Sequence, residues 1–172
     1  RCQRHPPAFD RCFAPYAYDD NIGHLVTRLK YGQKLACARL LGAMLAERIL
    51  TGQRDLPSIL VPVPLHPARM RERGFNQALE IARTVSRRTG IPLDADLVRR
   101  TRATPSQAEL PRRKRLKNLR GAFEVTRDPG WRHVAILDDV VTTGSTASEI
   151  SRTLKASGVT QVSVWAVART PE

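Results

Sequence analysis

The sequence predicts an α/β protein with a mostly parallel central sheet, helices on both flanks and a mobile basic loop. Short apolar runs at 58–63, 133–137 and 162–167 have the nearly continuous hydrophobicity of strands that are buried on both faces. Segments with a helical spacing of apolar residues separate these runs, and this alternation favours a parallel sheet. The length of 172 residues suits one domain with a substantial core.

The first elements are expected between residues 13 and 50. Residues 13–18 predict a short strand, and Asp19 or Asp20 can cap a helix that ends at Gly32. A second helix is expected over 34–50. Its apolar residues share one face and must pack on another element: Leu35, Ala38, Leu41, Leu45 and Ile49.

The next strand, 58–63, is expected to end at Pro62 and Pro64, because proline cannot donate to a sheet. Asn76 can cap a third helix that ends at Gly90. Four apolar residues lie on one face of this helix: Ala78, Ile81, Ala82 and Val85.

The segment 99–120 carries much of the positive charge. The chain has a net charge of +13, and this segment holds nine Arg or Lys residues against Glu109 alone. It contains Pro105 and Pro111 and no sustained apolar period, so we expect a mobile basic loop between weak strands at 97–98 and 122–125. Its charge favours an anionic partner, or else it is the ordinary surface of an Arg-rich chain.

Near the C-terminus, a strand, an acidic pair, a small-residue loop and a helix follow one another. The strand 133–137 leads into Asp138 and Asp139, the helix covers 145–155, and a final strand covers 162–167. A loop that enters a helix beyond a parallel strand offers backbone N–H groups to a phosphate. The loop residues that can cradle a monophosphate are Thr142, Thr143, Gly144, Ser145 and Thr146.

Two carboxylates beside such a loop suit the hydroxyls of a diol better than another anion. The motif therefore predicts a site for a ribose 5-phosphate. It is neither a Walker P-loop nor a Rossmann fingerprint, because the glycine patterns of both are absent. The alternative is an acidic turn followed by Ser and Thr residues that cap a helix.

This pattern of four apolar residues, two acids and V-x-T-G-x-T resembles the phosphoribosyl-pyrophosphate (PRPP) motif of type I phosphoribosyltransferases. Other segments resemble one subfamily, the ComF-type competence proteins, over nearly the whole chain. The resemblance implies a type I phosphoribosyltransferase-like fold. The segments are Leu29-Lys30-Tyr31, Val61-Pro62-Val63-Pro64, Arg71-Glu72-Arg73-Gly74-Phe75-Asn76-Gln77, Thr104-Pro105-Ser106-Gln107 and 115–123.

The resemblance assigns roles to several residues. Asp138 and Asp139 would bind the ribose hydroxyls, and 142–146 would bind the 5-phosphate. The loop 64–74 would bind pyrophosphate, and the basic segment would close over the reacting centre. The candidate pyrophosphate contacts are Arg69, Arg71 and Arg73, each of which would otherwise be an ordinary surface residue. The candidate contacts on the basic loop are Gln107 and Arg115. Asn76 and Gln77 would be either ligands or the cap and first turn of a helix.

The implied reaction is displacement of pyrophosphate from C1 of PRPP by a nitrogenous nucleophile, which makes the chain a glycosyltransferase with an unknown acceptor. Mg²⁺ would bridge pyrophosphate and ribose oxygens. No general base stands out, because a lone histidine such as His66 is more often structural.

The alternative is a non-catalytic competence factor that senses PRPP or binds single-stranded DNA, with competence or DNA-processing proteins as partners. Its candidate nucleic-acid contacts are Arg112, Arg113 and Lys114. The basic segment contains no aromatic residue on which bases could stack, and this disfavours a dedicated single-strand binder.

ComF-type proteins usually begin with a cysteine-rich zinc module. Residues 1–18 are interpreted as a remnant of such a module or a linker from it, and 19–172 as the phosphoribosyltransferase-like domain. Cys2, His5 and Cys12 do not form a persuasive metal set, so zinc is expected only with a missing N-terminal module. Three irregularly spaced cysteines, no signal peptide and no apolar run of about 18 residues predict a cytoplasmic protein without a membrane span.

Overall fold

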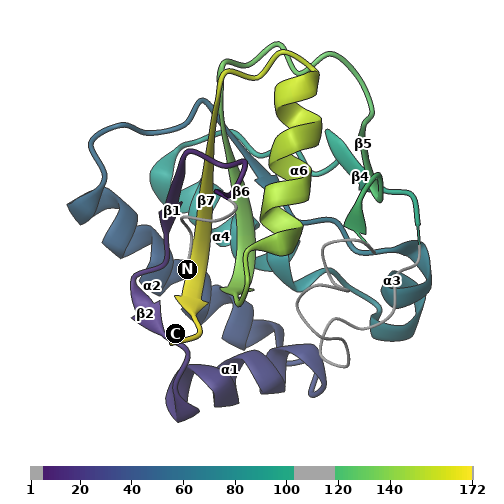
Figure 1. The fold of residues 1–172 in the computed structure, drawn as a ribbon. Helices are drawn as coiled ribbons and strands as arrows, with labels where there is room; N and C mark the ends of the chain where they lie inside the picture. Colours follow the sequence, from purple (N-terminus) through teal and green to yellow (C-terminus); the bar gives the residue numbers. More distant parts are fainter. Residues whose placement is uncertain (1–5, 103–118, 172) are drawn as a thin grey trace.

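The computed structural model describes residues 6–102 and 119–171, which are arranged around a five-stranded sheet (Figure 1). The strand order is β1-β7-β6-β3, with β2 also paired to β7, and every pair is parallel. The predicted α/β class with a mostly parallel sheet is confirmed. The strands are β1 (Arg11–Phe13), β2 (Tyr16–Ala17), β3 (Ile59–Pro62), β6 (His133–Val141) and β7 (Gln161–Arg169).

The central strands are buried on both faces, which explains their continuous hydrophobicity. Along β6, Val134 and Ile136 pack into one hydrophobic cluster, while Ala135 and Leu137 pack into the other. Successive side chains of a strand point to opposite faces, so a sheet covered on both sides needs apolar residues at every position.

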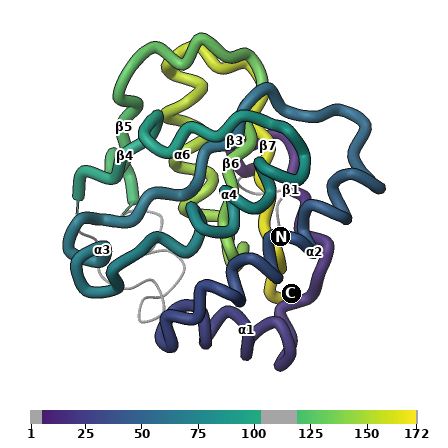
Figure 2. The backbone as a smooth tube through the Cα atoms, turned by 180° about the vertical axis from the view of Figure 1, so that it is seen from behind, coloured from purple at the N-terminus to yellow at the C-terminus, as the bar shows by residue number. Residues whose placement is uncertain are grey.

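Helices cover the two faces unequally (Figures 1 and 2). The helix α6 (Ser145–Ala156) contributes to one cluster, together with the antiparallel strands β4 (Val98–Arg100) and β5 (Phe123–Val125). The other cluster includes buried residues of three helices: α1 (Asp20–Lys30), α2 (Leu35–Gly52) and α4 (Gln77–Thr89).

A close contact joins α2 to α4. A Cβ on Gly42 would lie 2.7 Å from the Cβ of Thr84 and 2.9 Å from the carbonyl oxygen of Ile81. Only a glycine lets the two helices approach this closely. The apolar face predicted for 34–50 therefore packs against α4.

The helix α1 lies beyond the carboxyl ends of β6 and β7 (Figure 1). As predicted, Asp19 caps it: the carboxylate accepts a hydrogen bond of 2.9 Å from the backbone N–H of Ile22. Ile22, Val26 and Leu29 bury the apolar face. This packing brings the last residue of α1, Lys30, to the end of the sheet where the acidic pair lies.

Three features differ from the sequence-based expectations. A short helix, α3 (Pro67–Arg73), occupies much of the predicted loop 64–74; none of its residues is buried, so it has no apolar period. The strand β6 continues through the acidic pair to Val141, because it keeps pairing with β7. Finally, β1 and β2 lie in the segment 1–18, so the central sheet of the predicted domain includes strands from that segment.

Within 6–102 and 119–171, no helix has both the length and the hydrophobicity that a bilayer crossing requires.

Candidate functional site

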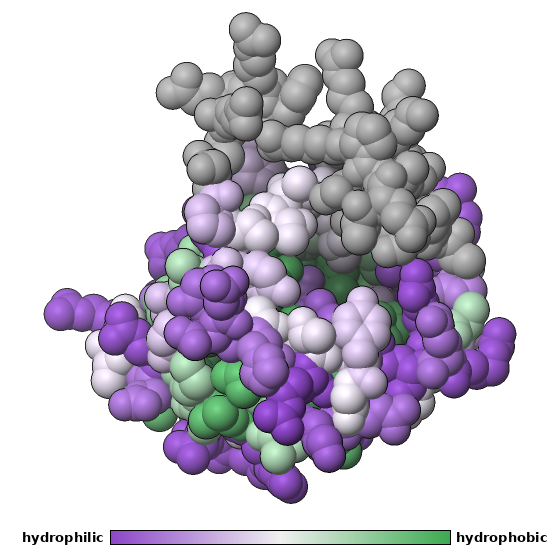
Figure 3. Space-filling model, turned by 90° about the horizontal axis from the view of Figure 1, so that it is seen from below, coloured by the Kyte–Doolittle hydropathy of each residue, from purple (hydrophilic) through white to green (hydrophobic). Residues whose placement is uncertain are grey.

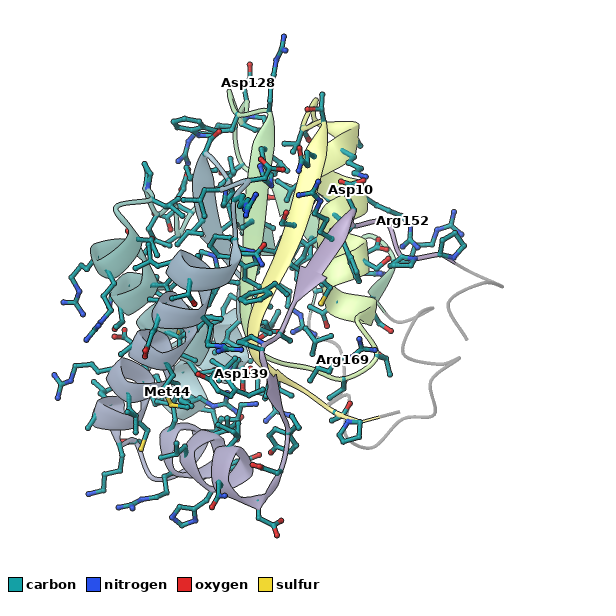
Figure 4. The ribbon with its side chains drawn as sticks, turned by 90° about the vertical axis from the view of Figure 1, so that its left-hand side faces the viewer. Asp10, Met44, Asp128, Asp139, Arg152 and Arg169 are labelled. Atoms are coloured by element: carbon teal, nitrogen blue, oxygen red, sulfur yellow. The ribbon has the colours of Figure 1, made fainter. Side chains whose placement is uncertain are left out.

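The acidic pair lies at the carboxyl end of the central strand β6 (Figure 4). Asp138 is partly exposed and Asp139 is buried at 3% exposure. The backbone N–H of Asp139 donates a hydrogen bond of 2.9 Å to Oδ1 of Asp138. In an open parallel sheet this end of the strands is where ligands bind.

The structure adds a cation that sequence reasoning did not assign to the site. Lys30 forms an ion pair with Asp139 through Nζ and Oδ2, and its side chain is only 24% exposed. The only sequence signal at 29–31 is the family resemblance, because no local pattern connects a lysine at a helix end with a carboxylate more than 100 residues later. Only the tertiary fold brings the two together.

The three charges at this end of the sheet perturb one another. Burial and the neighbouring charge of Asp139 raise the pKa of Asp138 well above its usual range. Burial acts in the same direction on Asp139, but the charge and hydrogen bond of Lys30 outweigh it and lower the pKa of Asp139. Burial would also lower the pKa of Lys30, yet the attraction of Asp139 raises it. Asp139 is thus the ionised member of the pair and Asp138 the more readily protonated one.

The predicted phosphate loop lies directly after this strand. Gly144 has φ +69° and ψ +7° and is the N-cap residue of α6, so no side chain caps that helix. The hydroxyls of Thr143 and Ser145 lie 2.8 Å apart in a mutual hydrogen bond. A helix N-terminus flanked by hydroxyls is a suitable place for a phosphate. Residues 142–146 and the acidic pair therefore share one end of one strand.

Of the three candidate pyrophosphate arginines, Arg73 lies near Lys30, the partner of Asp139. It donates a hydrogen bond of 2.7 Å to Oε1 of Gln77, and its guanidinium lies 5.9 Å from the ring centre of Tyr31. Its charge also lowers the pKa of Lys30. Arg69 instead pairs with Glu72 at 3.3 Å, and Arg71 is exposed.

The contacts of Asn76 support its role as a helix cap over its role as a ligand. Its Oδ1 accepts hydrogen bonds from the backbone N–H groups of Ala78 and Leu79, at 3.0 and 3.4 Å, and its Nδ2 donates to the carbonyl of Val63 at 3.0 Å. The residue is the cap of α4 and ties that helix to the end of β3. His66 likewise caps α3, accepting at Nδ1 from the backbone N–H of Ala68 at 3.2 Å.

Several predicted residues lie outside the described part of the chain: Gln107, Arg112, Arg113, Lys114, Arg115, Cys2 and His5. Of the basic segment, the described Arg99 pairs with Glu124, and Arg100 lies 5.7 Å from the ring centre of Phe123. Among the described residues, no three His, Cys, Asp or Glu side chains come together as a possible metal site.

Seen from the end of the molecule where α1 lies, the surface is mixed, with hydrophilic side chains around smaller apolar areas (Figure 3). An acidic pair, a glycine turn into a helix and two nearby cations form a polar site for a phosphorylated sugar more readily than for an apolar ligand.

Comparison with known proteins identifies relatives of the chain. No protein-family model matches the chain. The chain is 37% identical to the DNA utilization protein YhgH of Escherichia coli K12, over 99% of this chain and 77% of that protein. It is 34% identical to competence protein F of Haemophilus influenzae, over 98% and 76%.

Two of the solved structures that resemble the chain do so at low identity. A glutamine PRPP amidotransferase of Bacillus subtilis is 24% identical and covers 76% of this chain and 26% of its own, with a TM-score of 0.48. A purine phosphoribosyltransferase of Pyrococcus horikoshii is 18% identical and covers 76% and 72%, with a TM-score of 0.44.

The molecule is an α/β protein with a parallel central sheet, and the acidic pair and the small-residue loop 142–146 lie at the end of its central strand β6. It belongs to the ComF family, which includes the DNA utilization protein YhgH and competence protein F.

Proposed function

We propose that this chain binds PRPP and acts in the uptake or utilization of DNA. The observation that carries the proposal is the shared position of the acidic pair and the Gly144 turn at the carboxyl end of β6. One element thus presents acceptors for ribose hydroxyls beside donors for a 5-phosphate.

Each part of PRPP has a matching group. Asp138 and Asp139 accept hydrogen bonds from the ribose hydroxyls, while the backbone and hydroxyl groups of 142–146 donate to the 5-phosphate. Arg73 supplies positive charge for the pyrophosphate, since a guanidinium can hold two phosphate oxygens at once.

The reaction that fits this substrate is transfer of the phosphoribosyl group. A nitrogen of the acceptor forms a bond to C1, the bond from C1 to the pyrophosphate oxygen breaks, and pyrophosphate leaves with the bonding electrons. The attacking nitrogen then releases its proton to solvent water. Mg²⁺ would arrive with the substrate, bound by pyrophosphate and ribose oxygens, and would lower the charge of the leaving group.

The link to DNA is supported by the names of the relatives and by the basic segment. A protein called DNA utilization protein and one called competence protein both match nearly the full chain. The segment 99–120 carries a charge of +8 and can attract a phosphate backbone.

The first experiment is calorimetric titration of the purified protein with PRPP, with and without Mg²⁺. The test variant is Asp138→Ala/Asp139→Ala, and the control is Asp96→Ala, which removes an exposed carboxylate. We expect binding by the wild type and the control and none by the test variant. A folded wild type that does not bind PRPP would refute the proposal.

A second experiment separates catalysis from sensing. PRPP-dependent release of pyrophosphate is measured in the presence of candidate amines and bases, with Asp139→Ala as the comparison. Release that this substitution abolishes supports transfer. Binding of PRPP without release by any acceptor supports the alternative, a non-catalytic PRPP-sensing factor.

The proposed binding of DNA is tested by measuring how the affinity for single-stranded DNA depends on salt. Neutralising Arg112, Arg113 and Lys114 together should reduce the slope of log affinity against log salt by about 2 to 3. An unchanged slope would show that these positions do not contact the DNA backbone.

A further inference from the structure

Lys30 is a partly buried cation that has no role in the motif from which the site was predicted. Its ammonium group meets Asp139, whose side chain is 4% exposed. Lys30 is the last residue of α1, a helix that is fixed by its Asp19 cap and by three buried apolar residues. The packing of α1 therefore fixes the position of the ammonium group.

The groups that face Lys30 come from three elements. Asp138 and Asp139 lie on β6, Lys30 ends α1, and Arg73 ends α3. Arg73 is itself held by Gln77 on one side and lies over the ring of Tyr31 on the other. The result is two acids and two bases in one cluster, with Lys30 paired directly to the more buried acid.

The pairing has a physical consequence for the carboxylates. Two adjacent acids at a buried position do not both ionise readily, because burial and mutual repulsion favour the protonated forms. A cation beside one of the two acids stabilises the ionised form of that acid. The carboxylate next to Lys30 then stays a pure acceptor for hydrogen bonds, with its orientation set by the ammonium group.

We propose that Lys30 is a positioning residue that keeps Asp139 ionised and oriented to accept hydrogen bonds from the ribose hydroxyls of bound PRPP. This inference rests on the proposed function. Lys30 acts through Asp139 rather than by touching the sugar.

The experiment measures PRPP affinity by calorimetry, with Mg²⁺, between pH 5 and pH 8. Four proteins are compared: the wild type, Lys30→Met, Lys30→Arg and the control Lys34→Met, which removes an exposed lysine. Phosphates of PRPP also titrate near this range, so each profile is compared with that of the control.

For Lys30→Met, we expect the loss of affinity at acid pH to begin about 1 to 3 pH units higher, because Asp139 loses the charge that holds it ionised. Lys30→Arg keeps a cation and should keep the profile close to that of the wild type. A folded Lys30→Met with the affinity and profile of the control would overturn the inference while leaving PRPP binding intact. No binding by the wild type would instead overturn the proposed function, and the inference with it.

A double-variant comparison keeps the test decisive if Lys30→Met does not fold. Asp139→Asn and Lys30→Met/Asp139→Asn lack the buried unpaired carboxylate that threatens the single variant. If Lys30 acts only through Asp139, the two proteins bind PRPP with the same affinity. A clearly weaker double variant would show that Lys30 acts on the substrate other than through Asp139, which contradicts the positioning role.

Discussion

The ring of Phe9 lies against Gly144, at the point where the predicted phosphate loop enters α6. A Cβ on Gly144 would be 3.4 Å from Cε1 and 3.5 Å from Cζ of that ring. The segment that carries Phe9 is tied to the same helix: the backbone N–H of Ala8 donates to Oγ of Ser148 at 3.0 Å, and Asp10 pairs with Lys155 at 2.6 Å. The N-terminal segment therefore supports the loop from one side.

Because of this contact, Gly144→Ala tests whether the loop before α6 binds the phosphate. The left-handed backbone of Gly144 is unfavourable for alanine, and the new methyl group would touch Phe9. We expect a stability loss of about 1 to 2 kcal/mol in urea denaturation. Displacing one donor to a charged phosphate should also weaken PRPP binding about tenfold or more in calorimetry.

The matched control is Gly158→Ala, at the other end of α6. Gly158 also has a positive φ, +97°, but no atom outside its immediate neighbours lies within 4 Å of a Cβ placed there. This variant should lose similar stability and keep its affinity for PRPP. Equal loss of affinity in both variants would mean that the Gly144 effect is general strain and not a local change at the phosphate site.

The Gly144 turn shows how much of this site could be predicted from sequence. A glycine between hydroxyl residues, after an apolar run and before a helical pattern, is a local signal. The helix α6 is found where it was expected, and Gly144 before it has a left-handed backbone. The acidic pair is equally local. The ion pair of Lys30 with Asp139 has no local sequence signal, because it depends on how α1 packs beyond the end of the sheet.

Other elements could not be predicted for different physical reasons. The helix α3 buries none of its residues, so only His66, Pro67 and Gly74 mark its ends, and these residues also occur in loops. The strand β6 extends into the acidic pair because backbone pairing with β7 continues there, whatever the side chains are. Hydrophobic periodicity reports the burial of apolar side chains and gives no information about backbone pairing through a pair of acidic residues.

Asn76 should matter for stability through two separate bonds. Asn76→Ala removes the cap of α4 and leaves the carbonyl of Val63 without its side-chain donor. We expect a loss of about 1 to 3 kcal/mol in urea denaturation. Asn76→Asp keeps an acceptor for the cap but removes the donor, so a result between wild type and Asn76→Ala would separate the two bonds. No loss in either variant would contradict the structural role.

The contact between α2 and α4 predicts an unusual response to Gly42→Ala. Alanine normally favours a helix over glycine by about 1 kcal/mol. Here the new Cβ would overlap Thr84 and the carbonyl of Ile81, so we expect a net loss of about 1 to 3 kcal/mol. Gly52→Ala, in the same helix with open space around it, should be neutral or stabilising. Thermal unfolding of both variants measures the difference, and a stabilised Gly42→Ala would disprove the close approach.

The acidic pair predicts a specific pH dependence of stability. The pKa of Asp138 is raised in the folded state by burial and by Asp139. The folded state therefore holds the proton more tightly than the unfolded state, so Asp138 contributes stability below its unfolded pKa. That contribution is lost as the pH rises through the folded pKa. At neutral pH the ionised side chain costs stability, as is common for residues of a binding site.

Replacing Asp138 with asparagine removes this cost. The asparagine Oδ1 can still accept the backbone N–H of Asp139, so the local geometry is kept. We expect Asp138→Asn to be about 1 kcal/mol more stable than the wild type at pH 7, with the gain shrinking as the pH falls toward 4. The exposed Asp96→Asn serves as the control and should show no such trend. Melting temperatures measured from pH 4 to pH 8 test this expectation. A gain that stays constant over that range would show that the charge of Asp138 is not its source.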